Sequence, residues 1–392
     1  MPEIVIVGAK RTPIGSFQGQ FKSVSATDLG AMAIKAAVEH AGVAAEQVSE
    51  VIMGCVLPAG LGQAPARQAA LKAGLPVAAG CTTINKVCGS GMKAVMLAHD
   101  AIKAGSAEIV VAGGMESMTN APYLLPDARA GMRMGHGQVV DHMFYDALQS
   151  PYDQKMMGAF GEMCAERFHF TREQQDAFAI ASVERAQRAM AEGDFTDEIA
   201  AVDVKTRYSA AVYDQDEGPP RCNIEKIPQL RPAFKPDGSV TAANSSSISD
   251  GAAATVLMTA EKAAELGLNP LARIVAHVTH AQEPEWFTTA PSAAIAKVLE
   301  KAGWSIAQVD LFEINEAFAA VTMGAMTDHQ LDHAKVNVNG GACALGHPVG
   351  ASGTRILVTL IHALRRRGGK RGVATLCIGG GESVAVAVEL PD

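Results

Sequence analysis

The stretch AIKAAVEHAGVAAEQV at residues 33–48 returns as AIAKVLEKAGWSIAQV at residues 294–309, an offset of 261 positions. Seven of the sixteen positions are identical, including the Ala-Gly that ends the helical pattern and the Gln-Val that opens the next segment. Two further matches lie downstream: GSG at 89–91 with ASG at 351–353, and AGGMES at 112–117 with IGGGES at 378–383. The chain is therefore predicted to contain two copies of one unit.

Each copy predicts the order strand, helix, strand, buried helix, strand. Strands that alternate with helices favour an α/β fold, with a mainly parallel sheet and helical layers on its faces. Two such units would form a layered, pseudo-twofold body. The first copy contains a strand at 3–8, a helix capped by Thr27 or Asp28 and closed by Gly42, a strand at 51–54, a nearly uncharged helix at 92–103 and a strand at 108–114.

The segment 118–244 matches neither copy. It is rich in Pro, Gly, Asp and Met and contains one clear helix, which begins with a capping box at Thr171 and Gln174. Long insertions often act as lids or ligand clamps, so this segment is predicted to be a loop domain. The N-terminal half then comprises residues 1–117 plus about 245–268, and the C-terminal half comprises residues 269–392.

Composition narrows the class of protein. The chain has 392 residues, of which 48% are apolar and 19% charged, and its formal net charge is −8. These values exclude a disordered chain and argue against a partner that is a nucleic acid or an anionic membrane. No signal sequence or membrane span is expected. Seven cysteines without a CxxC pair predict reduced thiols in the cytoplasm rather than disulfides or structural zinc.

Cys88 is the first candidate for chemistry. It stands in NKVCGSG, at the start of the predicted buried helix. The unpaired N–H groups and positive dipole end of a helix N-terminus lower a thiol pKa from about 8.5 and favour the nucleophilic thiolate. The alternative is a buried packing cysteine, the usual fate of a free thiol.

His347 occupies the equivalent turn of the second copy, in GGACALGHPVGASG. It could serve as the general base for a nearby thiol, or it could be a histidine bonded to a carbonyl in a glycine-rich turn. Cys377 closes the last buried strand, and the three glycines after Ile378 leave N–H groups free to hold an oxyanion. Asn315 follows another strand, where it could position a water or act only as a turn former.

Other motifs have less support. His329 and His333 have the i, i+4 spacing of a shared helix face, but without a third ligand they indicate a solvated face rather than a metal site. No GxGxxG follows a strand and no GxxxxGK[ST] occurs, so nucleotide chemistry lacks support. We expect no metal.

The ordered set NKVCGSG, GGMES, VTAAN, NEAFA, GGACALGHPVGASG and CIGGG resembles the thiolases over essentially the whole chain. Among them, the short-chain acetoacetyl-CoA thiolases (acetyl-CoA C-acetyltransferases) are the most similar. The resemblance implies the thiolase fold, with two pseudo-twofold related, five-layered α/β halves and a loop domain over the coenzyme A site. It also implies a homodimer or homotetramer, with coenzyme A esters as substrates and no tightly bound cofactor.

The resemblance implies a role for each candidate. Cys88 matches the acyl-accepting nucleophile and His347 the base that activates it. Asn315 matches the amide that holds a catalytic water, and Cys377 the second acid/base. The N–H groups of Cys88 and Gly379 match an oxyanion hole. Residues that resemble coenzyme A or pocket contacts are Leu148, Met157, Arg221, Ala242, Ser246, Phe287, Ala317 and Phe318.

The chain also departs from the family pattern. Met156 stands where the short-chain enzymes carry histidine, Glu382 and Ser383 replace a small or uncharged pair, and Cys343 replaces an aliphatic residue. Phe287 stands where many members have methionine, and some members with an aromatic residue there accept α-methyl-branched substrates. The segment 216–221 lacks the tyrosine of potassium-dependent relatives, so potassium is not expected.

The implied activity is acyl transfer between a cysteine and coenzyme A, with condensation of two acetyl-CoA molecules or thiolysis of a short 3-ketoacyl-CoA. One thiol cannot carry the acyl group and also act as the free base, which explains the need for two. Two alternatives remain open: a thiolase of β-oxidation for longer or α-methyl-branched chains, and an inactive acyl-CoA-binding protein of the same fold.

Overall fold

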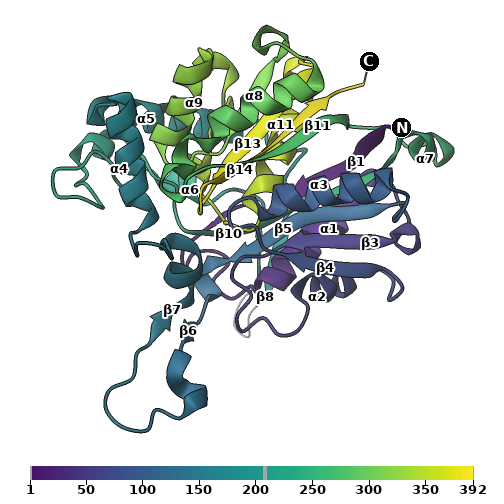
Figure 1. Ribbon diagram of the computed structural model, residues 1–392. Helices are drawn as coiled ribbons and strands as arrows, with labels where there is room; N and C mark the ends of the chain where they lie inside the picture. The colour runs from purple at the N-terminus through teal and green to yellow at the C-terminus, as the bar shows by residue number, and fades with distance from the viewer. Residues whose placement is uncertain (1, 206–209, 392) are drawn as a thin grey trace.

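A large twisted sheet runs through the molecule (Figure 1). The computed structural model describes residues 2–205 and 210–391, so the ends of both predicted halves and part of the predicted loop domain lie outside it. Within these ranges, ten strands form the sheet in the order β12-β13-β14-β11-β1-β10-β5-β3-β4, with β2 paired to β10. The strands are β1 (Ile4–Arg11), β2 (Gly15–Ser16), β3 (Glu50–Gly54), β4 (Gly80–Ile84), β5 (Val110–Ser117), β10 (Ser249–Thr259), β11 (Ala272–Ala281), β12 (Leu311–Ile314), β13 (Arg371–Ile378) and β14 (Glu382–Glu389).

The strand pairings confirm the predicted duplication. In the first half β3 and β5 are parallel, and β10 joins β5 to β1 through antiparallel pairings. In the second half β12 and β13 are parallel, and β14 joins β13 to β11 in the same way. The halves meet where β1 pairs with β11 over only two residue pairs. β4 was not predicted, because its sequence GCTTI lacks the apolar run of the other strands.

The strand register corrects one predicted match. The pairing of β3 with β5 begins at Val110, and the pairing of β12 with β13 begins at Gly372, so equivalent positions in β5 and β13 are 262 residues apart. The match of 112–117 with 378–383 is therefore wrong by four residues. It was suggested by two glycine-rich strings that occupy different places, a strand in one copy and a turn in the other.

Helices α3 (Ser90–Lys103) and α11 (Ser352–Arg367) contact each other between the two half-sheets and form one core with both. The outer face of the first half-sheet is covered by α1 (Ala26–Ala41) and α2 (Pro65–Lys72), and that of the second by α8 (Ala290–Ala302) and α9 (Ala319–His329). The five layers expected of each half are thus the layers of the whole molecule, because the central helical layer is shared.

Capping residues in the sequence predicted several helix ends. Gly42 closes α1 in the left-handed conformation, with φ of 69°, as predicted. The N-cap is Ser25 rather than Thr27 or Asp28, and its hydroxyl accepts from the Asp28 N–H. The capping box at Thr171 and Gln174 is confirmed at the start of α5 (Arg172–Ala191).

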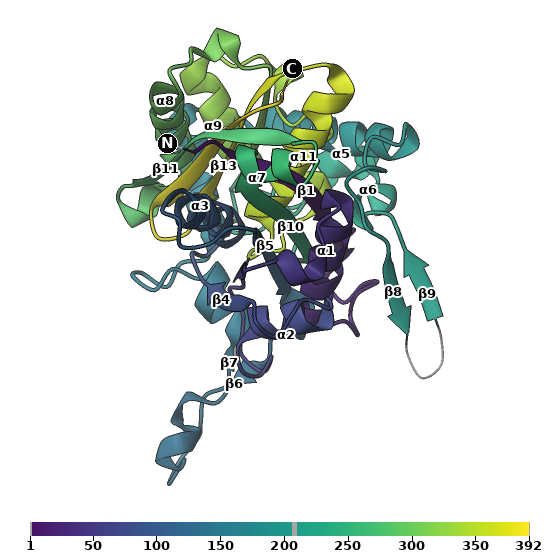
Figure 2. The ribbon, with the colours of Figure 1, turned by 90° about the vertical axis from the view of Figure 1, so that its right-hand side faces the viewer.

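The inserted segment lies mainly over the C-terminal half. Its helices α4 (Met157–Phe168) and α5 pack on α9, and α5 also packs on α10 (Ala342–Leu345). The pair β6 (Tyr123–Leu124) and β7 (Val140–Asp141) leads into a loop that projects from the layered body, and β8 (Val202–Lys205) pairs with β9 (Ala210–Tyr213) (Figures 1 and 2). Among the described residues, no helix combines the length and apolar character needed to cross a membrane.

Glycines let the N-termini of α3 and α11 touch. A Cβ on Gly91 would lie 2.7 Å from Thr354 Oγ1 and 3.0 Å from the Thr354 nitrogen. A Cβ on Gly353 would lie 2.5 Å from the Met92 nitrogen. Gly91 matches Gly353 and Met92 matches Thr354 at the offset of 262, so the contact is reciprocal and the predicted match of GSG with ASG is confirmed. The two helix starts can meet only because both positions lack a side chain.

Gly353→Ala tests this crossing. Helix propensity alone would stabilise the protein by about 1 kcal/mol, since Gly353 lies within α11. Crowding against the Met92 backbone should instead destabilise it by roughly 1–3 kcal/mol. Gly80→Ala is the control, because the nearest atom to its added Cβ is 3.9 Å away. Urea denaturation measures both, and a Gly353→Ala protein as stable as wild type would contradict the close approach.

Candidate active site

Cys88 lies in a tight turn between β4 and α3. Val87 before it has a φ of 45°, a left-handed conformation that a β-branched residue rarely adopts. The Ser90 hydroxyl fixes the turn, because it donates to the Val87 carbonyl at 2.6 Å and accepts from the Lys86 N–H at 2.8 Å. A Cβ on Gly89 would lie 2.4 Å from Ile378 Cδ1, so this glycine allows the end of β13 to approach the turn.

The predicted lowering of the Cys88 pKa at the helix N-terminus is outweighed by burial. Burial raises the pKa of the thiol to about 11, and the nearby Glu116 also raises it. The N–H groups of Gly379 and of Cys88 itself lower the pKa, but by less than burial raises it. The resting thiol is therefore protonated at neutral pH, and a base must take its proton when it reacts.

His347 has a ring nitrogen with the chemistry of such a base. Its Nδ1 lies 2.6 Å from the Ser352 hydroxyl, which donates its own hydrogen to the Pro348 carbonyl at 3.0 Å. Nδ1 must therefore carry the ring hydrogen, which leaves a lone pair on Nε2. Nε2 is buried and has no hydrogen-bond partner among the described residues. Burial and the Arg355 charge lower the pKa of His347 to about 3, so the ring is neutral at neutral pH.

Cys377, at the end of β13, is fully buried and belongs to an apolar cluster. Burial raises its pKa well above the usual range, and the next largest cause is the charge of Cys88. The next residue, Ile378, lies 2.4 Å from where a Cβ of Gly89 would be, so the end of β13 packs against the Cys88 turn although the two come from opposite halves of the duplication. Other members of the cluster are Met157, Phe160, Met163, Val240, Phe287, Ala317, Phe318 and Val321.

Asn315 follows β12 and has an exposed fraction of 1%. Its backbone N–H donates to the Thr375 carbonyl, and its carbonyl accepts from Ala317. Both polar atoms of its side chain are buried without a hydrogen-bond partner in the described part of the chain. A turn former or helix cap would use these atoms on the backbone, so the structure gives no support to that alternative. An unpaired buried amide instead fits the position of a ligand or water.

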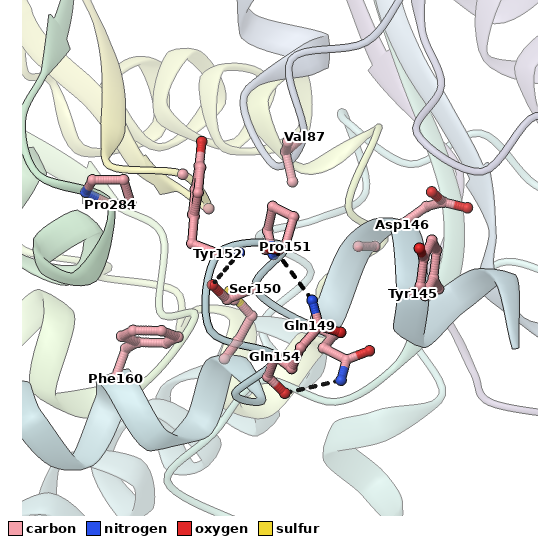
Figure 3. A pocket seen from close by; sticks show the side chains of 14 residues that line it. Val87, Tyr145, Asp146, Gln149, Ser150, Pro151, Tyr152, Gln154, Phe160 and Pro284 are labelled. Atoms are coloured by element: carbon pink, nitrogen blue, oxygen red, sulfur yellow. Dashed lines mark hydrogen bonds between the residues drawn. The ribbon is translucent and has the colours of Figure 1, made fainter. Parts of the chain in front are cut away.

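A cavity of about 370 Å³ opens next to the Cys88 turn, and its lining includes Val87 but not Cys88, His347, Asn315 or Cys377. The inserted segment lines most of it, Val87 comes from the first half, and Pro284, Gly379 and Gly380 come from the second. In Figure 3, the Tyr152 side chain lies between Pro284 and Val87. All three parts of the chain therefore meet at the Cys88 turn. The inserted segment contributes Tyr145, Asp146, Ala147, Gln149, Ser150, Pro151, Tyr152, Gln154, Met157 and Phe160.

The structure gathers some of the predicted contacts and separates others. Met157, Phe287, Ala317 and Phe318 share the apolar cluster of Cys377, whereas Leu148 packs in a second cluster that Cys88 borders. The Ser246 N–H donates to the Ala317 carbonyl at 2.9 Å, and Ala242 is exposed. Arg221 is also exposed, pairs with Glu217 at 2.7 Å and does not line the cavity.

Three departures from the family pattern have partners in the structure. Glu382 forms an ion pair with Lys86, in the turn that holds Cys88. The Ser383 hydroxyl is buried and donates to the Leu376 carbonyl at 2.8 Å. The Cys343 thiol donates to the Glu316 carbonyl at 3.8 Å. Each of the three side chains therefore makes a polar contact within the fold.

His329 and His333 do not share a helix face. α9 ends at His329, and His333 lies in the following 3-10 turn. The His329 ring contacts Ser292, whereas the His333 ring stacks on Phe178 with centroids 5.1 Å apart.

Glu116 is a buried residue near the site that the sequence did not identify, although it stands in the repeated stretch AGGMES at 112–117. Its buried carboxylate accepts from the N–H groups of Val56, Leu57 and Gly350 at 2.9–3.1 Å. Gly350 follows His347 by three residues, so Glu116 ties the first half to the histidine turn of the second. Burial raises the pKa of Glu116 to about 7.

The pKa of Cys88 predicts how the free enzyme reacts with iodoacetamide. Only the thiolate is alkylated, and a pKa of about 11 means that its fraction rises about tenfold per unit between pH 7 and pH 9. The alkylation rate, followed by the mass of the Cys88 peptide, should rise over this whole range. A rate that levels off below pH 9 would contradict the raised pKa.

The comparisons with known proteins agree with this geometry. The family model described as "Thiolase, N-terminal domain" matches residues 4–261, and the model described as "Thiolase, C-terminal domain" matches residues 268–390. The chain is similar to an acetyl-CoA acetyltransferase of Pseudomonas aeruginosa, with 51% identity over 99% of both chains. It is also similar to acetyl-CoA acetyltransferase 1 of Arabidopsis thaliana, with 52% identity over 99% of this chain and 94% of the relative.

Among solved structures, the chain is similar to the Bacillus anthracis acetyl-CoA acetyltransferase, with a TM-score of 0.97 and 43% identity. That match covers 100% of this chain and 99% of the other. Family descriptions, full-length relatives and fold point to the same conclusion. The chain belongs to the thiolase family.

Proposed function

We propose that the protein is an acetyl-CoA C-acetyltransferase, which condenses two acetyl-CoA molecules to acetoacetyl-CoA and coenzyme A and catalyses the reverse thiolysis. The observation that carries this proposal is the packing of the Cys88 turn against the end of β13, which carries Cys377, because a Cβ on Gly89 would lie 2.4 Å from Ile378 Cδ1. His347 Nε2 and the Asn315 amide, both buried without a partner among the described residues, support it. The names of the relatives support the same reaction.

The first half-reaction loads Cys88. His347 Nε2 takes the thiol proton as the sulfur attacks the thioester carbonyl of acetyl-CoA. The N–H groups of Cys88 and Gly379 stabilise the tetrahedral oxyanion. When the intermediate collapses, the bond from carbon to the coenzyme A sulfur breaks. The departing sulfur takes the proton from His347, and acetyl-Cys88 and free coenzyme A remain.

The second half-reaction forms the carbon–carbon bond. His347, neutral again, takes the proton of the Cys377 thiol, and the Cys377 thiolate then removes an α-proton from a second acetyl-CoA. The protonated His347 and an Asn315-held water stabilise the enolate oxygen. The enolate carbon attacks acetyl-Cys88, and the Cys88 sulfur leaves with the proton from His347, while Cys377 keeps the α-proton. The products are acetoacetyl-CoA and the free enzyme with both thiols restored. The raised pKa of Cys377 makes its thiolate a strong base for this weakly acidic proton.

The surroundings of Cys377 favour a short acyl group. The rings of Phe160 and Phe287 pack edge to face with centroids 5.7 Å apart, in the same cluster as Cys377. Met157 completes this wall, because its sulfur lies 3.5 Å from where a Cβ of Gly379 would be. These bulky side chains leave least room for a long acyl chain next to Cys377.

The proposal extends to the rest of the substrate and to the assembly. The segment 118–244 covers coenzyme A, with Leu148, Arg221, Ala242 and Ser246 among its contacts, and the protein needs no tightly bound cofactor. It acts in the cytoplasm as a homodimer or homotetramer. Movement of Arg221 from Glu217 to the ligand would be required, since the two form an ion pair in the free protein.

Variants of the two cysteines separate the half-reactions. After incubation with acetyl-CoA, Cys377→Ala should still form one acetyl adduct per chain on Cys88, whereas Cys88→Ser should form none. Intact-mass spectrometry measures the adduct. Cys377→Ala should also fail to produce acetoacetyl-CoA. Normal condensation by Cys377→Ala would contradict the assigned roles, and the absence of any adduct on wild type would favour an inactive binding protein.

Chain length gives a second test. The value of kcat/KM for thiolysis should fall at least tenfold from acetoacetyl-CoA to 3-ketooctanoyl-CoA, and Phe287→Ala should reduce that difference, because it opens the wall beside Cys377. The control is Phe178→Ala, whose ring packs against His333 outside this cluster. Equal kcat/KM values for both substrates would favour a β-oxidation thiolase, and a preference for 2-methylacetoacetyl-CoA would favour a branched-chain enzyme.

A further inference from the structure

Three side chains that the proposed reaction does not use converge between the two halves of the molecule. His99 and Asp100 lie near the end of α3, and His277 lies on β11. His99 Nδ1, Asp100 Oδ1 and His277 Nε2 are each 3.0 Å from the other two atoms. Both histidines are buried, whereas the Asp100 side chain is half-exposed. One nitrogen from each of two rings and one carboxylate oxygen therefore lie close together in one cluster.

This arrangement has the dimensions of a metal site. A tetrahedral Zn²⁺ with bonds of about 2.0–2.1 Å keeps its ligand atoms about 3.3 Å apart, so the three atoms need to separate by only about 0.3 Å. The two imidazole rings are close to perpendicular, with an interplanar angle of 83° and centroids 4.7 Å apart. They can thus direct their nitrogens at one ion without stacking.

We propose that His99, Asp100 and His277 form a binding site for a divalent transition metal of the zinc class, with a fourth position open to water. Two imidazoles and one carboxylate are a common ligand set for zinc, with room for a water. No sequence motif announces the site, because His277 is 178 positions from His99.

The charged side chains around the site influence which metal ion binds best. Lys301 donates to the His277 carbonyl at 3.0 Å, and Lys103 is the other cation close to His99. These lysines oppose any cation and leave Asp100 as the anionic ligand. Ca²⁺ and Mg²⁺ prefer several oxygen ligands and should bind poorly. Zn²⁺, Co²⁺ and Ni²⁺ gain from the two imidazoles, so the site should discriminate in their favour.

The metal would have a structural effect rather than a part in acyl transfer. His99 lies eleven residues beyond Cys88, which is about 16 Å along a helix at 1.5 Å per residue. An ion held by α3 and β11 would link the central helical layer to the C-terminal half-sheet. It would therefore stabilise the folded chain in proportion to its concentration without contacting the substrate.

Zinc binding should be measured by calorimetry on full-length protein from which metals have been removed and whose accessible thiols have been alkylated. Alkylation matters because free cysteines also bind zinc. Wild type should bind one Zn²⁺ per chain, and His277→Gln and Asp100→Asn should each weaken binding by roughly 100-fold. His280→Gln, on the same strand, is the matched control and should bind as wild type does.

Cobalt spectroscopy on the same proteins identifies the ligands. Co²⁺ in wild type should give the visible bands of a tetrahedral site with nitrogen and oxygen ligands, without a thiolate charge-transfer band. The melting temperature of wild type should rise with Zn²⁺, and that of Asp100→Asn should not; because Asp100 is half-exposed, this variant tests the site without disturbing the core. Equal zinc binding by wild type and both variants, or no binding at micromolar Zn²⁺, would show a hydrogen-bonded cluster only and overturn the proposal.

Discussion

The close crossing of α3 and α11 is the constraint on which the rest of the structure depends. Neither Gly91 nor Gly353 can carry a side chain without meeting the opposite helix start. Each helix follows a turn that holds a reactive group, Cys88 in the first half and His347 in the second. Helix starts that meet therefore bring the two turns together, and the distance between them is set by backbone contact rather than by flexible side chains.

Glu116 adds polar connections to this apolar crossing. Its carboxylate accepts from N–H groups of both halves, so a buried acid fixes the histidine turn against the end of β3. Burial is the main cause of the raised pKa of Cys88, and the negative charge of Glu116 adds to it. The group that orders the site therefore also acts on the thiol beside it.

Much of this arrangement could be predicted from the sequence, because the signals are local. The repeat gave the order of elements, Gly42 marked a helix end, and glycine-rich turns pointed to Cys88, His347 and Cys377, whose roles remain predictions. The sequence could not predict features that depend on contacts between distant parts of the chain. The pKa of Cys88 depends on burial among residues from both halves and the inserted segment. The partners of Glu116 lie up to 234 positions away, and β4 forms because β3 offers it an edge.

The register of the two half-sheets shows which positions of the two copies are equivalent, and the two thiols do not occupy equivalent positions. At the offset of 262, Cys88 corresponds to Gly350 and Cys377 to Met115. In a dimer of identical half-length chains, any substitution would occur twice, and both turns would carry the same group. Covalent fusion removes that restriction, so the proposed nucleophile and the proposed base can occupy a symmetric frame at positions that are not copies of one another.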